Sequence, residues 1–235
     1  MKNISDISAI ILAGGLGTRL RSVVSDRPKV MATINGRPFL SYLFDQIENA
    51  GVSHVVLSVG YLGNMIESQF GNNYHNLDIE YSRENHPLGT GGAIRLAFPL
   101  VRSEVVLVMN GDSYCHADLQ SFYRSHGAGG TQASILLTQV EDIARYGQIE
   151  IDSHNLVSRF SEKGASHGPG LINAGIYLIN RFLLATIPQF QALSLERETF
   201  PEWISHGIQG IVLGEKFIDI GTPESYAEAE IFFEV

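Results

Sequence analysis

A glycine-rich stretch near the start of the chain carries residue types that suit the binding of phosphate groups. Gly14, Gly15 and Gly17 lie close together, so the backbone can turn sharply and expose its N–H groups. Arg19 places a fixed positive charge beside those donors, and Lys29 follows shortly after. Backbone donors together with two cations favour a polyphosphate ligand.

Two familiar glycine-rich motifs do not fit this stretch. The P-loop requires Gly-x-x-x-x-Gly-Lys-Ser/Thr, a pattern that the sequence lacks. The dinucleotide-binding motif Gly-x-Gly-x-x-Gly begins at Gly15 and Gly17 but has Leu20 in its last position, and the mid-thirties hold no acidic residue for a ribose. A dinucleotide-dependent oxidoreductase is therefore disfavoured, and a plain strand-to-helix turn is the structural alternative.

Two aspartates are candidates for holding a divalent cation. Asp112 follows a strongly apolar run and a glycine, and Asp219 lies within another apolar run, where a charge without a partner is costly. Mg²⁺ favours a few carboxylates together with water and phosphate oxygens. We therefore expect Asp112 and Asp219 to share one Mg²⁺, with two unrelated turn aspartates as the alternative.

Further polar residues after predicted strands suit recognition of a base and of a second ligand. Glu84 would read guanine, because a carboxylate accepts from the adjacent N1–H and N2–H₂ donors at once. Asn173 with Gly175 would read sugar hydroxyls at close approach, and Lys163 lies at the end of a predicted strand. An exposed glutamate, a turn into a strand and a solvated lysine are the respective alternatives.

Apolar runs that alternate with helical patterns predict an α/β fold with a doubly wound, mostly parallel, Rossmann-like sheet. The elements expected in the first half are strands at 7–12, 55–59, 78–82 and 105–109, and helices at 38–47, 62–70 and 91–100. Ligands of such sheets bind beyond the carboxyl ends of the strands, and the candidate stretches of this half all fall there.

The second half of the chain is less regular and predicts a mixed sheet with a smaller lobe that receives a second ligand. Its expected elements are strands at 134–138, 147–151, 156–160 and 174–179, and helices at 195–206 and 223–233. We expect a single domain over 1–235, with a mainly nucleotide-binding lobe at 1–130. The remainder, 131–235, is expected to be mainly the lobe for the second ligand, with a C-terminal helix.

Composition excludes several classes of protein. Apolar residues make up 44% of 235 residues, enough for a core, but no run approaches the ~18 residues of a membrane span, and the start resembles no secretory leader. A net charge of −9 argues against nucleic-acid binding. The single Cys115 fits a reducing cytoplasm. The eight histidines lack zinc-binding spacing, and we expect them on the surface or in loops.

Together these motifs resemble the sugar-1-phosphate nucleotidyltransferases, and the match extends in order over nearly the whole chain. The matching stretches are Leu12–Leu20, Pro28-Lys29, Glu84 with Pro87–Ala93, Gly111-Asp112, Tyr146-Gly147, Phe160–Lys163, Asn173–Tyr177 and Asp219–Pro223. The resemblance implies a nucleotidyltransferase fold of the GT-A-like kind, in which 131–235 would be mainly a sugar-phosphate-binding lobe. It also implies Mg²⁺-dependent transfer of a nucleoside monophosphate from a triphosphate to a sugar 1-phosphate, with release of pyrophosphate.

The resemblance also implies roles for individual residues. Nucleotide binding is expected at Leu12, Ala13, Gly14, Gly15, Gly17, Thr18, Arg19, Glu84, Pro87, Gly89 and Thr90. Sugar-phosphate binding is expected at Lys29, Gly147, Glu162, Lys163, Asn173 and Gly175. Catalysis is expected at Arg19, Lys29 and Asp112, with the metal held by Asp112 and Asp219.

Within that family the chain most resembles the D-glycero-α-D-manno-heptose 1-phosphate guanylyltransferases, on length, on Pro-Leu-Gly-Thr-Gly-Gly-Ala-Ile at 87–94 and on Ser194-Leu195-Glu196. Gly164 replaces the family's usual proline after Glu-Lys. The likeness implies GTP and the heptose 1-phosphate as substrates, and a GDP-sugar for surface polysaccharide as product. Mannose 1-phosphate, another nucleotide–sugar pair, or a regulatory subunit that binds a sugar nucleotide are the alternatives. A homodimer is one option for the assembly.

Overall fold

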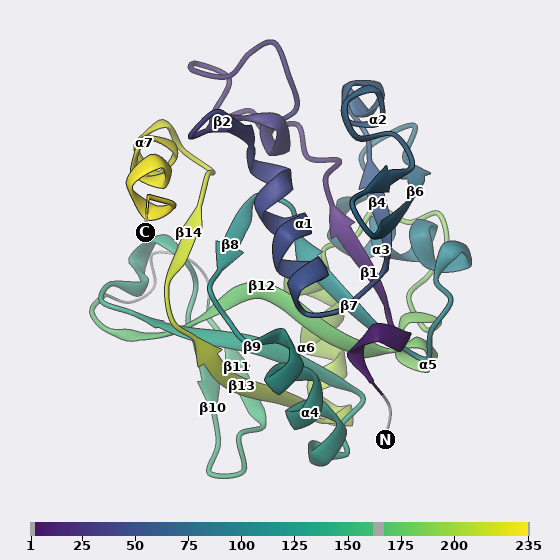
Figure 1. Ribbon diagram of the computed structural model, residues 1–235. Helices are drawn as coiled ribbons and strands as arrows, with labels where there is room; N and C mark the ends of the chain where they lie inside the picture. The colour runs from purple at the N-terminus through teal and green to yellow at the C-terminus, as the bar shows by residue number, and fades with distance from the viewer. Residues whose placement is uncertain (1–2, 162–166, 235) are drawn as a thin grey trace.

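An eight-stranded sheet forms the centre of the computed structural model, which describes residues 3–161 and 167–234 (Figure 1). The strand order is β13-β9-β12-β7-β1-β4-β6-β5. The strands are β1 (Ser8–Leu12), β4 (His54–Val59), β5 (Asn73–Tyr74), β6 (Leu77–Arg83), β7 (Val105–Asn110), β9 (Ala133–Val140), β12 (Gly170–Asn180) and β13 (Ile208–Gly214).

Two of the eight strands, β12 and the edge strand β5, run opposite to the other six. β1 pairs in parallel with β4 and β7, and β4 pairs in parallel with β6. β12 runs antiparallel to both β7 and β9, while β13 joins β9 in parallel at the edge. The predicted mostly parallel, mixed sheet is therefore confirmed.

Helices cover both faces of the sheet because successive strand residues point to opposite sides. Ile11 and Leu57 belong to one apolar core, whereas their neighbours Ile10 and Val56 belong to the other. The first core packs beneath α1 (Phe39–Asn49), α2 (Gly63–Phe70), α4 (Leu119–Gly129) and α7 (Pro223–Phe232). The second packs beneath α3 (Gly89–Ala97), α5 (Arg181–Leu184) and α6 (Phe200–Trp203). Figure 1 shows α1 and α4 on the near face.

Short elements complete the fold around this sheet. Three two-stranded pairs are formed by β2 (Thr33–Ile34) with β3 (Arg37–Pro38), β8 (Ser113–Cys115) with β14 (Phe217–Asp219), and β10 (Ile149–Ile151) with β11 (Val157–Phe160). Single 3₁₀ turns occur at Ile4–Asp6, Lys29–Met31, Phe98–Leu100, Ile143–Arg145 and Ile204–His206. In the two stretches that the structure describes, no helix combines the length and apolarity needed to span a bilayer.

Two predicted helices have different bounds in the structure. The helix expected over 91–100 begins at Gly89 and ends at Ala97, where the chain continues as the 3₁₀ turn Phe98–Leu100. Pro99 has no N–H to donate to the carbonyl four residues before it, so the α-helical ladder cannot continue. The helix expected over 195–206 is divided into a π-helical turn at Leu195–Thr199, α6 and a 3₁₀ turn. Pro201 has no N–H to continue a regular α-helical ladder there.

Helix α4 was missed by the sequence analysis, although its ends carry recognisable signals. Asp118 caps the first turn by accepting from the Ser121 N–H at 3.0 Å, and Gly130 ends the helix in the left-handed conformation. Strand β13 was also missed. Gly210 interrupts its apolar pattern, and its partner β9 lies far away in the chain.

Two histidines are buried, His54 on β4 and His126 on α4, so the expectation of surface or loop histidines is wrong for them. His54 contacts Ser8 Oγ at 2.9 Å and Glu80 Oε1 at 3.0 Å. His126 contacts Ser134 Oγ on the neighbouring strand β9 at 2.8 Å. Burial lowers the pKa of both imidazoles, so they act as neutral, hydrogen-bonded core residues.

Removal of a core ring should measure how strongly the second apolar core supports the fold. Phe200 is fully buried, with its ring centroid 5.8 Å from Phe160 and 5.0 Å from Tyr177. We expect Phe200→Ala to lower the free energy of unfolding by about 3–5 kcal/mol, measured by urea denaturation. Phe190 is 84% exposed, so Phe190→Ala should change it by less than about 0.5 kcal/mol. Equal losses in the two variants would contradict this account of the core.

Candidate functional site

Two cavities open at the carboxyl ends of the parallel strands, where ligands of such sheets bind. The first has a volume of about 390 Å³ and the second about 630 Å³. Both are lined by Arg19, Asn110 and Asp112, so the cavities meet at the end of β7. The other residues of the first cavity are Leu12, Gly14, Gly15, Leu16, Gly17, Thr18, Lys29, Val30, Ser58, Glu84, Pro87, Gly89, Thr90, Ala93 and Gly221.

The floor of the first cavity is a row of residues held in register by three strands. Leu12 on β1 pairs with Ser58 on β4 and with Asn110 on β7. Partners in a parallel ladder share one face of the sheet, so the three side chains lie side by side. This is the face covered by α3, whose first residues form the wall above the row.

The glycine-rich loop borders this cavity with free backbone donors. Among the residues that the structure describes, the N–H groups of 14–19 bond to no acceptor of the protein. Leu20 is buried in the core and fastens the loop, and the chain then continues to the 3₁₀ turn at Lys29–Met31. A dinucleotide-binding fold would begin a helix directly after such a loop, so this geometry differs from that of an oxidoreductase.

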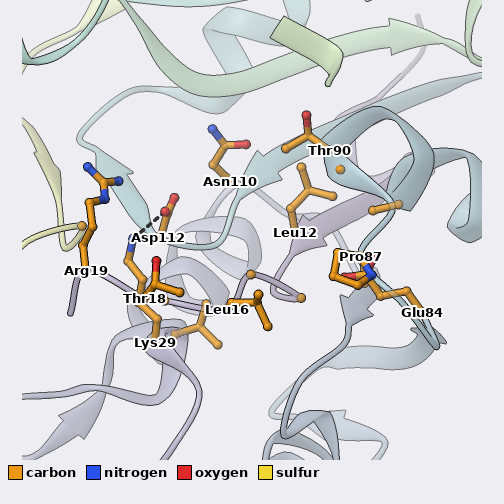
Figure 2. A pocket seen from close by; sticks show the side chains of 18 residues that line it. Leu12, Leu16, Thr18, Arg19, Lys29, Glu84, Pro87, Thr90, Asn110 and Asp112 are labelled. Carbon is orange, nitrogen blue, oxygen red and sulfur yellow. Dashed lines mark hydrogen bonds and ion pairs between the residues drawn. The ribbon is translucent and has the colours of Figure 1, made fainter. Parts of the chain in front are cut away.

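Positive charge gathers at one end of the first cavity. Lys29 Nζ lies 2.6 Å from Asp112 Oδ2, and the Lys29 side chain is only 11% exposed. Figure 2 shows this pair as a dashed line, with Arg19 extended beside it. The buried lysine neutralises the aspartate locally, while the guanidinium of Arg19 remains directed toward the opening.

Glu84 lies at the opposite end of the first cavity, next to Pro87 (Figure 2). Its Oε2 accepts from the Leu88 N–H at 3.1 Å, and its Oε1 packs against Gly14 and Gly60. Burial raises the pKa of the Glu84 carboxyl, and the Leu88 bond opposes that effect. Each carboxylate oxygen can accept a further bond, so both remain able to receive ligand donors.

A segment from the second half of the chain closes the wall between the cavities. The Leu193 N–H donates to the Leu88 carbonyl at 2.9 Å, and the Leu195 N–H donates to Thr90 Oγ1 at 2.8 Å. Thr90 Oγ1 in turn donates to Glu196 Oε2 at 2.7 Å. Thr90 faces the first cavity and Glu196 the second, so these bonds connect their walls.

The second cavity has a polar wall built on β12. Asn173 Oδ1 accepts from the Gly175 N–H at 2.8 Å, and Asn173 Nδ2 donates to the Tyr177 hydroxyl at 2.9 Å. The cavity is further lined by Ser113, Tyr146, Gly147, Gln148, Ile149, Phe160, Ser161, Ser194, Glu196, Arg197, Pro201, Phe217 and Asp219. The predicted Glu162 and Lys163 lie outside the described residues.

Asp112 and Asp219 are brought together by backbone pairing. β8 and β14 run antiparallel with Ser113 opposite Asp219, and the Ile220 N–H donates to the Asp112 carbonyl at 2.9 Å. Asp219 Oδ1 accepts from the Gly221 N–H at 2.8 Å. Both carboxylates line the second cavity, and two carboxylates open to water and phosphate match the preference of Mg²⁺.

The predicted nucleotide-binding residues line the first cavity, with the exception of Ala13, whose side chain is buried beneath the loop. Gly147, Asn173 and Gly175 line the second cavity, whereas Lys29 faces the first. The sequence analysis assigned no role to Ser58, Asn110, Glu196 or Arg197, which also line these cavities. Asn110 directly precedes Gly111-Asp112, and its position after an apolar strand was the available signal.

Comparisons with known proteins were made on the whole chain. The model of the family described as nucleotidyl transferase matches residues 8–234. D-glycero-alpha-D-manno-heptose 1-phosphate guanylyltransferase of Aneurinibacillus thermoaerophilus is 40% identical over 225 residues, covering 95% of this chain and 97% of that protein. Mannose-1-phosphate guanylyltransferase of Mycobacterium tuberculosis is 37% identical, covering 94% and 62% respectively.

Among solved structures, the crystal structure of HddC from Yersinia pseudotuberculosis complexed with GMP-PN resembles this chain closely. The TM-score is 0.86 at 37% identity, with 97% of this chain and all of that chain covered. The likeness therefore extends over both cavities and the sheet that supports them.

Gly111 offers a test of the backbone contact that positions Asp112. A Cβ at Gly111 would lie 2.5 Å from the Leu12 carbonyl oxygen, so β1 and β7 would have to separate. We expect Gly111→Ala to lower the free energy of unfolding by about 1–3 kcal/mol in urea denaturation. Gly127 in α4 has open space around it, so Gly127→Ala should raise that free energy by up to about 1 kcal/mol. An unchanged free energy of unfolding in Gly111→Ala would show that the close approach of residue 111 to the Leu12 carbonyl is not needed.

Proposed function

The chain belongs to the nucleotidyl transferase family, and we propose that it transfers GMP from GTP to D-glycero-α-D-manno-heptose 1-phosphate, releasing pyrophosphate. The observation that carries this proposal is the meeting of two cavities at Arg19, Asn110 and Asp112. A nucleoside triphosphate in the first cavity and a sugar phosphate in the second would approach each other at that junction. Joining two phosphates needs this end-to-end arrangement.

The relatives support both the donor and the acceptor. The Aneurinibacillus protein is by name a guanylyltransferase acting on the heptose 1-phosphate, and the two chains cover each other almost completely. HddC was crystallised with GMP-PN, a guanine nucleotide analogue, and shares this fold at a TM-score of 0.86. The resulting GDP-heptose would serve the synthesis of surface polysaccharide, and the cytoplasm is the proposed compartment because GTP is made there.

The proposed reaction is an in-line displacement at the α-phosphorus of GTP. An oxygen of the sugar phosphate forms the new P–O bond, and the bond from the α-phosphorus to the bridging oxygen of pyrophosphate breaks. The second pKa of a phosphate monoester is about 6, so the nucleophile is already largely a dianion at neutral pH. No general base is required, and catalysis rests on positioning and neutralisation of charge.

The cations of the first cavity would carry that neutralisation. Lys29 lies at the junction with its ammonium group buried beside Asp112, where it would face the phosphates of both substrates. Arg19 and the unbonded N–H groups of 14–19 would hold the β- and γ-phosphates and stabilise the departing pyrophosphate. We assign the sugar-phosphate contact of the family to Lys163 on the sequence match alone.

Asp112 and Asp219 are the proposed ligands of Mg²⁺. Backbone pairing between β8 and β14 brings these two carboxylates to one wall of the second cavity, at its border with the phosphate end of the first. Bound there, Mg²⁺ would supply positive charge to the triphosphate. Two further acidic clusters with a histidine, Asp45–Glu48–His75 and His54–Asp78–Glu80, are engaged in ion pairs of their own away from the cavities.

Glu84 is the proposed reader of the base. It lies at the end of the first cavity remote from Arg19 and Lys29, which is where the base of a bound triphosphate would lie (Figure 2). Its two carboxylate oxygens match the adjacent N1–H and N2–H₂ donors of guanine. Asn173, Gly147 and Gly175 would contact the sugar ring in the second cavity.

Mannose 1-phosphate is the second candidate acceptor. The Mycobacterium protein named as a mannose-1-phosphate guanylyltransferase is 37% identical over 224 residues. Mannose and the heptose share the pyranose ring and differ at the exocyclic carbon. The lining residues of the second cavity would therefore decide between them rather than the phosphate-binding motifs.

A substrate panel tests the proposal directly. Pyrophosphate release is measured with each of four nucleoside triphosphates against the 1-phosphates of heptose, mannose and glucose, with Mg²⁺ and with EDTA. We expect Mg²⁺-dependent turnover with GTP and the heptose. Turnover with another pair would reject the specificity, and binding of a sugar nucleotide without any turnover would indicate a regulatory subunit.

Replacement of Asp112 should separate metal binding from folding. Asp112→Asn keeps the side-chain volume but removes the charge that would bind Mg²⁺ and that now pairs with Lys29. We expect turnover to fall by at least about 10³-fold while the circular dichroism spectrum stays unchanged. Asp118→Asn, at an exposed helix cap, is the matched control for loss of one carboxylate charge. Near-normal activity of Asp112→Asn would exclude the metal role.

Replacement of Glu84 should change the choice of base. Glu84→Gln retains one acceptor and adds a donor, so only one of the two guanine donors would remain satisfied. We expect kcat/KM for GTP to fall about tenfold to a hundredfold, with a smaller change for UTP. An unchanged ratio of GTP to UTP would remove Glu84 from base recognition.

A further inference from the structure

Asn110 has an amide oxygen that the described protein leaves unsatisfied. Asn110 Oδ1 is buried and has no hydrogen-bond partner among residues 3–161 and 167–234. A buried carbonyl without a donor is unfavourable, and such groups are rare in folded proteins. The side chain nevertheless lines both cavities, so it lies where a ligand can reach it.

The surroundings of Asn110 orient its amide. Gly175 lies opposite it on β12, and a Cβ at Gly175 would come within 2.9 Å of Asn110 Nδ2. The amide nitrogen therefore lies on the β12 side, toward the second cavity. Figure 2 shows the oxygen on the other branch, directed toward Leu12 and Thr90. The χ2 torsion of asparagine is broad, so a small rotation brings this oxygen to the surface of the first cavity.

The place of Asn110 along the first cavity identifies the part of the ligand that it would meet. Glu84 marks the base end, and Lys29 with Arg19 marks the phosphate end. Asn110 pairs in register with Leu12 between those ends. In a nucleoside triphosphate the ribose lies between base and phosphates, so its hydroxyl groups would pass over this part of the floor.

Other polar groups in the middle of the cavity are already engaged or displaced from it. The Thr90 hydroxyl donates to Glu196 at 2.7 Å and accepts from the Leu195 N–H at 2.8 Å. Ser58 Oγ has no partner among the described residues, but it lies beyond Leu12 on β4, on the side of Glu84. Asn110 is therefore the acceptor best placed for a ribose hydroxyl.

We propose that the Asn110 amide accepts a hydrogen bond from the ribose 2′-hydroxyl and thereby selects GTP over 2′-deoxyGTP. This inference rests on the proposed guanylyltransferase function. The bond satisfies the buried oxygen only when a ribonucleotide is bound, so a deoxynucleotide leaves it unpaired. Discrimination of this kind is strong because a ligand without the hydroxyl loses one hydrogen bond and also leaves a buried protein group without a partner.

The test measures kcat/KM for GTP, 2′-deoxyGTP and 3′-deoxyGTP in the wild-type enzyme and in variants. Asn110→Leu removes both polar atoms at similar volume, and Asn110→Asp retains an acceptor. Ser58→Ala is the matched control, because it removes the other unpartnered polar group of the same row. The KM for the sugar 1-phosphate is measured in parallel, and thermal unfolding establishes that each variant is folded.

We expect the wild-type enzyme to prefer GTP over 2′-deoxyGTP by about tenfold or more, and 3′-deoxyGTP to behave like GTP. Asn110→Leu should abolish that preference by lowering the value for GTP alone, with the KM for the sugar phosphate unchanged. Asn110→Asp should retain the preference at a lower absolute rate, because it adds a negative charge near the phosphates. Ser58→Ala should leave the ratio intact.

Three results would overturn the inference: equal use of GTP and 2′-deoxyGTP by the wild-type enzyme, a preference that persists in Asn110→Leu, or a change confined to the KM of the sugar phosphate. Each of these leaves the guanylyltransferase activity itself standing. Absence of turnover with GTP in the wild-type enzyme would instead reject the proposed function. If Asn110→Leu fails to fold, the wild-type ratio and Asn110→Asp decide the question.

Discussion

The register of three parallel strands is the constraint on which the site depends. Hydrogen bonds from β1 to β4 and β7 align Ser58, Leu12 and Asn110 as one row at the carboxyl ends of the strands. A slip of one residue would turn this row to the opposite face and replace it with core side chains. The glycine-rich loop and Asp112 follow the same strands directly, so the register also sets the relative positions of the loop backbone and the Asp112 carboxylate, which we propose bind phosphate and metal.

Contacts between segments that are distant in the chain join the remaining walls of the cavities. Lys29 and Asp112 bring the segment after the glycine-rich loop onto the end of β7, and Thr90 with Glu196 fastens the second half of the chain to α3. In both pairs, a charged or polar side chain of one segment forms an ion pair or a hydrogen bond with a side chain of the other segment. The two cavities thus meet at Arg19, Asn110 and Asp112 and are held together by the same contacts, which suits the proposed reaction between two anions.

Much of this architecture could be predicted from residue types and their spacing within short stretches of the sequence. The glycine-rich loop, the apolar strands and the polar residues after them are encoded within short windows, and the structure brings those residues to one edge of the sheet. The sequence analysis did not assign the roles of side chains whose surroundings depend on pairing between distant segments. Asn110 and Ser58 become a cavity floor only through register, and His54 and His126 are tolerated in the core only because Ser8 and Ser134 reach them from other elements.

The pairing of β8 with β14 also has a consequence for the order of folding. Ser113 and Asp219 are partners although 219 − 113 = 106 positions separate them in the chain, so closing this loop carries an entropic cost that a local helix does not have. Long-range pairing of that kind forms late and slowly compared with local helices. Asp112 and Asp219 become neighbours only when that pairing has formed, so a refolding chain would have to dock β14 onto β8 before it gains the proposed affinity for a divalent ion. Metal affinity would then report the docking of the C-terminal segment rather than the folding of the first half of the chain.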